Sequence, residues 1–226
     1  MVNNLRHNFL KIIPLLCVLL YHFSCAPAPY KVVQPPETDY VIASWYGPKF
    51  NGRPTASGEK FDMYAMTCAH KEFTFGTRLR VTYLKTGKSV VVTVNDRGPF
   101  IRGRGLDLSY AAAKDIGLIK EGVGKVKIQY LGRDKRYVKV LSPMSSVPYK
   151  GPFTIQVGSF KEKSNAERLK KGLKIRYSKV YLTTVYINDE KFYRVRVGSF
   201  NSRELAYSFA ETMTEEGYSV FVTGNP

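Results

Sequence analysis

The sequence predicts a mixed fold in two blocks, a mainly β block over residues 40–133 and an α+β block over residues 151–226. In the first block, short runs of alternating apolar and polar residues are separated by glycine-rich turns, a pattern typical of a small β-barrel. In the second block, the segment 153–160 recurs as 193–200, and each copy leads into a helical pattern. The intervening segment 134–150 is charged and then rich in serine and proline, so we expect it to be a linker.

The first 39 residues predict export. The chain has 226 residues, of which 44% are hydrophobic, and its longest apolar run lies within residues 1–24. This run follows a mildly basic start and is too short to span a bilayer, which is typical of a signal peptide. Cys25 comes directly after this segment and resembles the lipid-attachment cysteine of bacterial lipoproteins. The alternative is a secreted protein in which Cys25 is an unmodified thiol without a function. Residues 25–39 are proline-rich and are expected to form an extended tether.

The charge and the cysteine count narrow the class of protein. Lys and Arg number 35 against 18 Asp and Glu, a net charge of +17, which attracts nucleic acid, anionic lipid or anionic wall polymers. Because the predicted export signal argues against nucleic acid, we expect a partner in the cell envelope. Three cysteines cannot form a disulfide framework, and no metal-ligand spacing is present, so neither metal nor cofactor is expected.

The elements of the first block follow from alternation and from turn residues. Residues 78–84 alternate strictly, 85–88 form a turn, and 89–95 return as a β-branched run, which predicts a hairpin. Residues 109–117 begin with a capping serine and end with a glycine, which predicts a two-turn helix. Residues 126–130 predict one more strand.

The second block predicts the order βαββαβ with both helices on one face of the sheet. Helices are expected at a capping box that starts at Ser164 and at its relative in 201–204. Alternation directs five residues to the opposite face, namely Thr154, Gln156, Gly158, Arg194 and Arg196. Such a face suits an extended polar polymer, and a merely solvated face is the alternative.

Three short polar segments of the first block carry the candidate chemistry. They contain Glu59, His70 and Asp96. Two carboxylates and one histidine, without a nucleophile elbow, favour general acid–base catalysis, in which a carboxyl with a raised pKa protonates a glycosidic oxygen. His70 could equally be structural, and Asp107 could simply cap the helix at 109–117.

The motifs of residues 40–131 resemble the rare lipoprotein A (RlpA) family. They are Ala43–Phe50, Gly52–Glu59, Thr67–Lys71, Phe75–Thr77, Asn95–Phe100 and Asp107–Ala113. The resemblance implies a double-psi β-barrel, and the C-terminal repeat resembles the SPOR domain, which binds peptidoglycan stripped of its peptides. Active members of the family are lytic transglycosylases that cleave between N-acetylmuramic acid and N-acetylglucosamine and leave a 1,6-anhydro end.

The resemblance also implies roles for individual residues. Glu59, His70 and Asp96 are the expected catalytic residues. Either carboxylate could be the acid/base, with the other stabilising charge and His70 holding a carboxylate by a hydrogen bond. The expected substrate-binding residues are Tyr46, Arg97 and Asp107 in the first block and Gln156, Arg194 and Arg196 in the second. Cys68 stands where the family usually has alanine.

The expected setting is the envelope of a Gram-negative-type bacterium. The protein would be anchored by lipid on Cys25, in the outer membrane facing the periplasm, and enriched at the division septum, where it meets peptide-free glycan strands. The alternative function is a non-catalytic, expansin-like wall protein. An RNA-binding sheet is disfavoured because the exposed strand centres carry Gln156, Arg194 and Arg196 instead of aromatic residues. The sequence identifies no protein partner.

Overall fold

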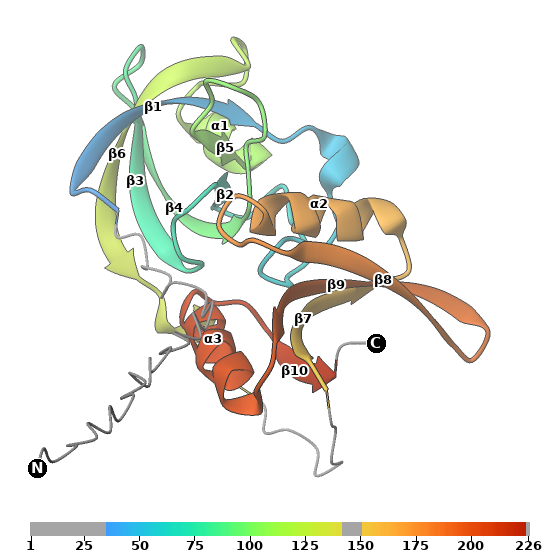
Figure 1. Ribbon diagram of the computed structural model, residues 1–226. Helices are drawn as coiled ribbons and strands as arrows, with labels where there is room; N and C mark the ends of the chain where they lie inside the picture. Colours follow the sequence, from blue (N-terminus) through green and yellow to red (C-terminus); the bar gives the residue numbers. More distant parts are fainter. Residues whose placement is uncertain (1–34, 142–150, 225–226) are drawn as a thin grey trace, which may run out of the picture.

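The computed structural model describes residues 35–141 and 151–224, which form two domains in contact with each other (Figure 1). The predicted signal peptide, Cys25 and residues 25–34 of the predicted tether lie outside the described residues. Within the described ranges, no helix is long and apolar enough to cross a membrane.

Six strands close into a barrel in the order β1-β5-β2-β4-β3-β6. β1 runs parallel to β5 and β2 parallel to β4, whereas the other neighbouring pairs are antiparallel. This architecture confirms the predicted double-psi β-barrel. The strands are β1 (Thr38–Trp45), β2 (Thr67–His70), β3 (Thr77–Tyr83), β4 (Ser89–Asp96), β5 (Leu106–Leu108) and β6 (Val123–Arg133).

Alternation along the strands fills the barrel. Leu79 and Val81 of β3 are fully buried, while Arg80 between them faces solvent, as the period of two requires. A short 3-10 helix η1 (Pro48–Phe50) follows β1, and the helix α1 (Tyr110–Asp115) follows β5. Ser109 caps α1, because its hydroxyl accepts a hydrogen bond from the Ala112 N–H at 3.2 Å, which confirms the predicted start.

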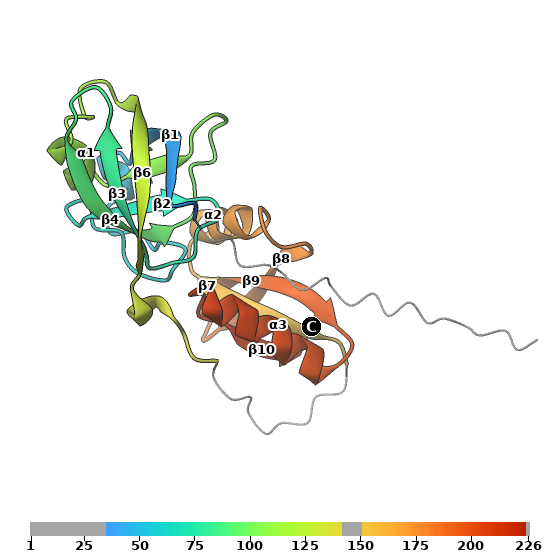
Figure 2. The same ribbon diagram turned by 90° about the vertical axis from the view of Figure 1, so that its left-hand side faces the viewer.

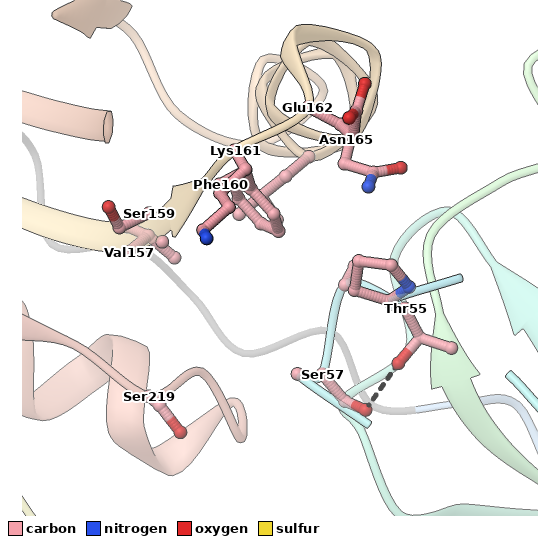
Figure 3. Close-up of a pocket in the computed structure, with 14 residues that line it drawn as sticks. Thr55, Ser57, Val157, Ser159, Phe160, Lys161, Glu162, Asn165 and Ser219 are labelled. Atoms are coloured by element: carbon pink, nitrogen blue, oxygen red, sulfur yellow. Dashed lines mark hydrogen bonds between the residues drawn. The ribbon is translucent and has the colours of Figure 1, made fainter. Parts of the chain in front are cut away.

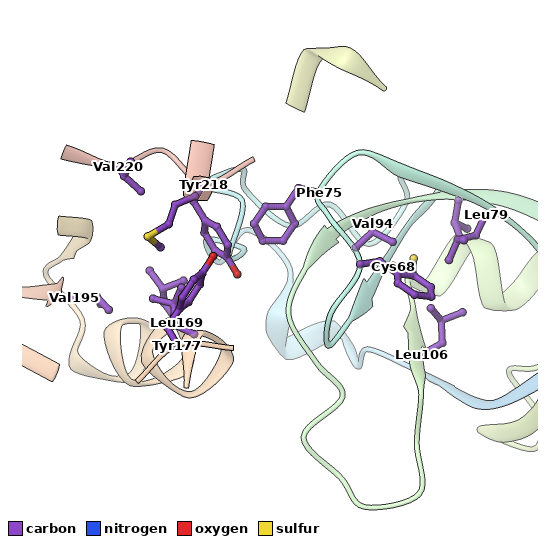
Figure 4. Packing of buried hydrophobic residues seen from close by; sticks show 14 of the residues in the cluster. Cys68, Phe75, Leu79, Val94, Leu106, Leu169, Tyr177, Val195, Tyr218 and Val220 are labelled. Atoms are coloured by element: carbon purple, nitrogen blue, oxygen red, sulfur yellow. The ribbon is translucent and has the colours of Figure 1, made fainter. Parts of the chain in front are cut away.

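The second domain has the predicted order and layers. Its elements are β7 (Phe153–Phe160), α2 (Lys163–Leu173), β8 (Val180–Ile187), β9 (Glu190–Phe200), α3 (Arg203–Glu215) and β10 (Phe221–Gly224). The sheet order is β10-β7-β9-β8. Leu169 of α2 and Val195 of β9 belong to one buried cluster (Figure 4). Tyr177, which follows α2, lies with its ring 5.7 Å from that of Phe209 of α3, as expected for two helices on one face of the sheet.

Two local predictions for this domain are wrong. Neither predicted capping box begins its helix at the expected residue: Glu162 and not Ser164 takes the N-cap position of α2, without a side-chain hydrogen bond, and Ser202 and not Asn201 caps α3. The pairing of β7 with β9 also shifts register between Gln156 and Gly158, which marks a β-bulge. A Cβ added to Gly158 would lie 3.0 Å from Leu169 of α2, so this residue faces the helices and not the opposite face.

The domains are joined by buried polar contacts. Within the second domain, the Arg176 and Glu216 side chains form an almost completely buried ion pair of 2.9 Å, and the Arg176 guanidinium also donates to the Glu72 carbonyl of the barrel. The Phe75 N–H of the barrel donates to the Glu216 carbonyl at 3.0 Å, and the Phe75 ring packs against Tyr218 (Figure 4). The predicted linker 134–150 begins with a 3-10 helix, η2 (Lys135–Tyr137), and the Lys139 N–H donates to Thr214. The start of the linker is therefore part of the contact between the domains.

Candidate active site

Asp96 ends β4 at the rim of the barrel and is 5% exposed. Its Oδ1 accepts hydrogen bonds from the backbone N–H groups of Ala56 and Arg97, each at 2.8 Å. Its Oδ2 accepts a hydrogen bond from the Tyr46 hydroxyl at 3.1 Å. One carboxyl oxygen is thus fixed by the backbone, and the other is held by a single hydroxyl.

Burial raises the pKa of the Asp96 carboxyl above its ordinary value. The two backbone donors, the positive charge of Arg168 and the Tyr46 hydroxyl oppose this rise. The pKa of Tyr46 is raised in turn by its burial and by the negative charges of Asp96 and Asp107. Asp96 therefore stays protonated to a higher pH than an exposed aspartate, as a general acid requires.

Glu59 lies on the exposed side of the turn that holds Asp96. Its Oε2 accepts hydrogen bonds from the Asn95 amide and from the Tyr137 hydroxyl, both at 2.9 Å. Tyr137 belongs to the segment that was predicted to be a linker, so sequence analysis missed it. The structure brings Glu59 close to the residue before Asp96, but Glu59 does not line the small chamber beside Asp96.

His70 does not hold a carboxylate, which corrects the expected role. Its Nδ1 accepts hydrogen bonds from the backbone N–H groups of Glu72 and Phe73, each at 3.1 Å, and its ring stacks on Phe73. Burial, followed by the positive charges of Arg97, Lys71 and Arg176, lowers the pKa of His70 to about 3. Because Nδ1 is an acceptor, the neutral ring carries its proton on Nε2.

Asp107 lies within β5 and does not cap α1, whose N-cap is Ser109, so the capping role is wrong and the expected role in substrate binding stays a prediction. Its Oδ1 accepts a hydrogen bond from the Ser44 hydroxyl, which also accepts one from Arg104 at 3.1 Å. Burial raises the pKa of the Asp107 carboxyl, against the effects of Ser44, Arg104 and Lys71. Cys68, on the neighbouring strand β2, is a buried free thiol whose pKa is raised by burial and then by Asp107.

Arg97 lines the small chamber beside Asp96, but its guanidinium takes part in the contact between the two domains, and its expected role in substrate binding stays a prediction. It is 2% exposed, and its Nε donates to the Tyr218 hydroxyl at 2.7 Å. Its Nη1 donates to the Phe73 carbonyl at 2.9 Å, and its guanidinium lies 3.8 Å from the centre of the Phe75 ring. Arg97 therefore joins the two domains.

The expected binding residues of the second domain are only partly available. Gln156 and Arg196 are register partners and share the face away from the helices, as predicted. Arg196 is nevertheless 4% exposed and donates to the Thr183 hydroxyl and the Gly224 carbonyl. Gln156 and Arg194 are only partly buried and remain the accessible members of this set.

Residues of the second domain close the site over Asp96, and sequence analysis missed them. In Figures 1 and 2, α2 lies between the barrel and the four-stranded sheet. Asn165, Arg168 and Leu169 of α2, with Phe160, face Asp96 across a chamber of about 10 Å³. Arg168 donates to Asn165 at 2.6 Å. A chamber of this size holds no sugar ring, so a substrate has to displace these side chains to reach Asp96.

The described residues contain no group of three or more His, Cys, Asp and Glu side chains that could hold a metal ion. The arrangement offers instead one enclosed carboxyl, a tyrosine hydroxyl and a neutral imidazole. These groups can donate and accept protons and hydrogen bonds.

Two family models match the chain: one described as lytic transglycolase over residues 38–128, and one described as SPOR domain over residues 149–224. A Helicobacter pylori protein named endolytic peptidoglycan transglycosylase RlpA is 35% identical over 186 residues, which cover 74% of this chain and 59% of that protein. A protein of the same name from Pseudomonas aeruginosa is 33% identical and covers 72% of this chain and 63% of its own. One from Vibrio cholerae is 48% identical over 47% of this chain and 41% of its own. The chain thus spans less than two thirds of the length of these relatives.

Proposed function

The chain belongs to the RlpA family and has a SPOR domain, and from this premise we propose that it is a lytic transglycosylase acting on peptidoglycan glycan strands. The observation that carries the proposal is Asp96, an enclosed carboxyl with a raised pKa at the barrel rim. A glycosidic bond needs such a proton donor, because the departing sugar hydroxyl is a poor leaving group until it is protonated.

The proposed reaction uses Asp96 twice. The protonated carboxyl gives its proton to the glycosidic oxygen as the bond from that oxygen to the anomeric carbon of N-acetylmuramic acid breaks. The 6-hydroxyl oxygen of the same sugar then bonds to the anomeric carbon and gives its proton to the Asp96 carboxylate. The products are a free 4-hydroxyl on N-acetylglucosamine and a 1,6-anhydro end, and no water is consumed.

We assign the proton transfer to Asp96 and not to Glu59. Glu59 is exposed and does not line the chamber beside Asp96, and both hydrogen bonds to its carboxylate reach Oε2. Glu59 keeps the role of stabilising positive charge that develops at the anomeric carbon. His70, neutral and protonated on Nε2, serves as a hydrogen-bond donor and not as a base.

The finer parts of the proposal concern substrate and place. We propose that the substrate is peptide-free, because the SPOR domain presents the partly exposed Gln156 and Arg194 to an extended polymer. Lipid attachment at Cys25 would hold the protein at the outer membrane facing the periplasm, and glycan binding would enrich it at the division septum. The partners are then the glycan strand and the membrane.

A non-catalytic glycan-binding protein is the second candidate. The observation that favours it is the chamber beside Asp96, which at about 10 Å³ is closed to a sugar. Incubation of the purified protein with amidase-treated, peptide-free glycan strands, followed by mass spectrometry of the soluble fragments, separates the two candidates. Fragments with 1,6-anhydro ends are expected, whereas binding without such fragments would establish the second candidate.

A further inference from the structure

A cavity of about 460 Å³ lies where the two domains meet (Figure 3). Residues 54–58 of the barrel form one wall, and residues 157–162 with Asn165 of the SPOR domain form the other. In Figure 3, Phe160 and Asn165 face Thr55 across the space. The volume falls within the range of about 300–1,000 Å³ that is usual for small-ligand sites.

The two walls combine an apolar surface with hydrogen-bonding groups. Pro54, Val157, Phe160 and Leu169 supply the apolar surface. The polar groups are the Asn165 amide, the exposed Ser159 and the paired hydroxyls of Thr55 and Ser57, which lie 3.0 Å apart. An acetylated sugar offers both hydroxyl groups and apolar faces, so a short glycan matches these walls.

The cavity adjoins the candidate acid. It shares Pro54, Thr55, Ala56, Phe160, Asn165 and Leu169 with the small chamber beside Asp96. Ala56, in the wall of both spaces, donates its N–H to Asp96. Arg168 lines only the chamber and is hydrogen-bonded to Asn165, so this pair of side chains separates the two spaces.

We propose that this cavity is a glycan-binding subsite built jointly by the two domains, in which sugars next to the scissile bond are held. The identity of the glycan rests on the proposed function. A strand in the cavity reaches Asp96 when the Asn165 and Arg168 side chains turn aside. The SPOR domain then belongs to the catalytic cleft through its β7–α2 corner, in addition to any contact that Gln156 and Arg194 make on its sheet.

The internal repeat provides a matched control for a test. Ser159 and Ser199 occupy the same position of the repeated segment, and both are exposed, but only Ser159 lines the cavity between the domains. In the full chain carrying Asp96→Asn to prevent cleavage, we would measure the affinity for a peptide-free tetrasaccharide of alternating N-acetylglucosamine and N-acetylmuramic acid. The variants are Ser159→Trp, Ser199→Trp and Asn165→Leu.

The expected result is weaker binding for Ser159→Trp and unchanged binding for Ser199→Trp. Asn165→Leu should weaken binding about tenfold, as the loss of one hydrogen bond would. In the Asp96→Asn background without further changes, the amide resonances of Gly58 and Lys161, one on each wall, should shift on titration. This measurement does not depend on the folding of any cavity variant.

Equal affinity of Ser159→Trp and Ser199→Trp, or unshifted Gly58 and Lys161 resonances, would overturn the proposal. Weakened binding by Ser159→Trp, combined with a protein that keeps Asp96 and yields no anhydro ends, would support the subsite and contradict the proposed activity. Cleavage by the protein with unchanged affinities of the cavity variants would support the proposed activity and contradict the subsite. The two claims can therefore fail separately.

Discussion

A carboxylic acid can act as a general acid near neutral pH only where its surroundings disfavour the ionised form. Asp96 has such surroundings, because α2 and the turn at Ala56 remove it from water. The N–H groups of Ala56 and Arg97 work against this effect by stabilising the carboxylate. They stabilise the ionised form that accepts the second proton in the proposed reaction, so the same residue is equipped for both of its halves.

His70 should make stability depend on pH. Its pKa is lowered from 6.5 to about 3, so the unfolded chain takes up a proton in this range while the folded protein does not. The contribution of His70 to the free energy of unfolding is therefore complete above pH 6.5 and decreases as the pH falls towards 3. The slope should approach about 1.4 kcal/mol per pH unit for one proton.

His70→Asn provides the comparison, because the Asn oxygen can replace Nδ1 as acceptor for Glu72 and Phe73 without titrating. Denaturant unfolding of both proteins between pH 7 and pH 4 measures the effect. The excess stability of the wild type over the variant should decrease with falling pH. A difference that is constant over this range would contradict the assigned pKa.

Individual residues differ in how far the sequence predicts them. The sequence motifs proposed Glu59, His70 and Asp96 as candidates, because these residues lie in local turns and strand ends. They could not place Arg97, whose partner Tyr218 is 121 residues away in the chain. The motifs also could not show that α2 faces Asp96, because the local sequence pattern of residues 163–173 predicts a helix but not which other domain it contacts.

Strands and helices were predicted where one local rule decides the structure. The hairpin of β3 and β4 follows from alternation and a glycine turn, and the observed strands agree. Parity failed at Gly158 because the bulge near Val157 inserts an extra residue, which no alternation pattern reveals. Ser164 failed as a cap because α2 begins one residue before it.

The cap of α1 gives a test at this scale. Ser109 is fully buried, and its hydroxyl accepts a hydrogen bond from the Ala112 N–H. Ser109→Ala leaves this N–H without an acceptor and should lower the free energy of unfolding by about 1 kcal/mol. Chemical denaturation checks this value. Ser109→Asp, which can still cap, should retain more of the stability than Ala, and the reverse order would show that the hydroxyl does not act as a cap.

The docking of the two domains organises the whole molecule. The composition of residues 134–150 suggested domains that act separately, yet Arg97, Arg176 and Glu216 make hydrogen bonds across the interface. Truncating one partner of such a contact leaves a buried polar group unpaired. A single substitution at one of these residues should therefore destabilise the docked arrangement of the domains. The approach is close enough that glycine is needed at Gly172, where a Cβ would lie 2.8 Å from the Arg97 Cβ.

Gly172→Leu should therefore separate the domains. The new side chain overlaps the stem of Arg97, and overpacking of this kind typically destabilises by about 1–3 kcal/mol. Small-angle scattering should show a larger radius of gyration, and the thermal midpoint should fall. Glu167→Leu, on an exposed position of α2, is the control and should change neither. A Gly172→Leu protein with an unchanged radius of gyration and an unchanged thermal midpoint would show that the contact is not as close as described.

The central claim is that Asp96 transfers the proton in glycan cleavage, and Asp96→Asn tests it most directly. Asn can accept the N–H bonds of Ala56 and Arg97 and donate to the Tyr46 oxygen, so the fold should persist. Because burial raises the pKa of Asp96, replacing the ionisable group should not lower the melting temperature at neutral pH. The measurement is the rate at which 1,6-anhydro ends appear from peptide-free strands, together with the affinity for those strands. We predict a rate lower by about 10²–10⁴-fold with unchanged affinity. An Asp96→Asn protein that cleaves at the wild-type rate would contradict the account.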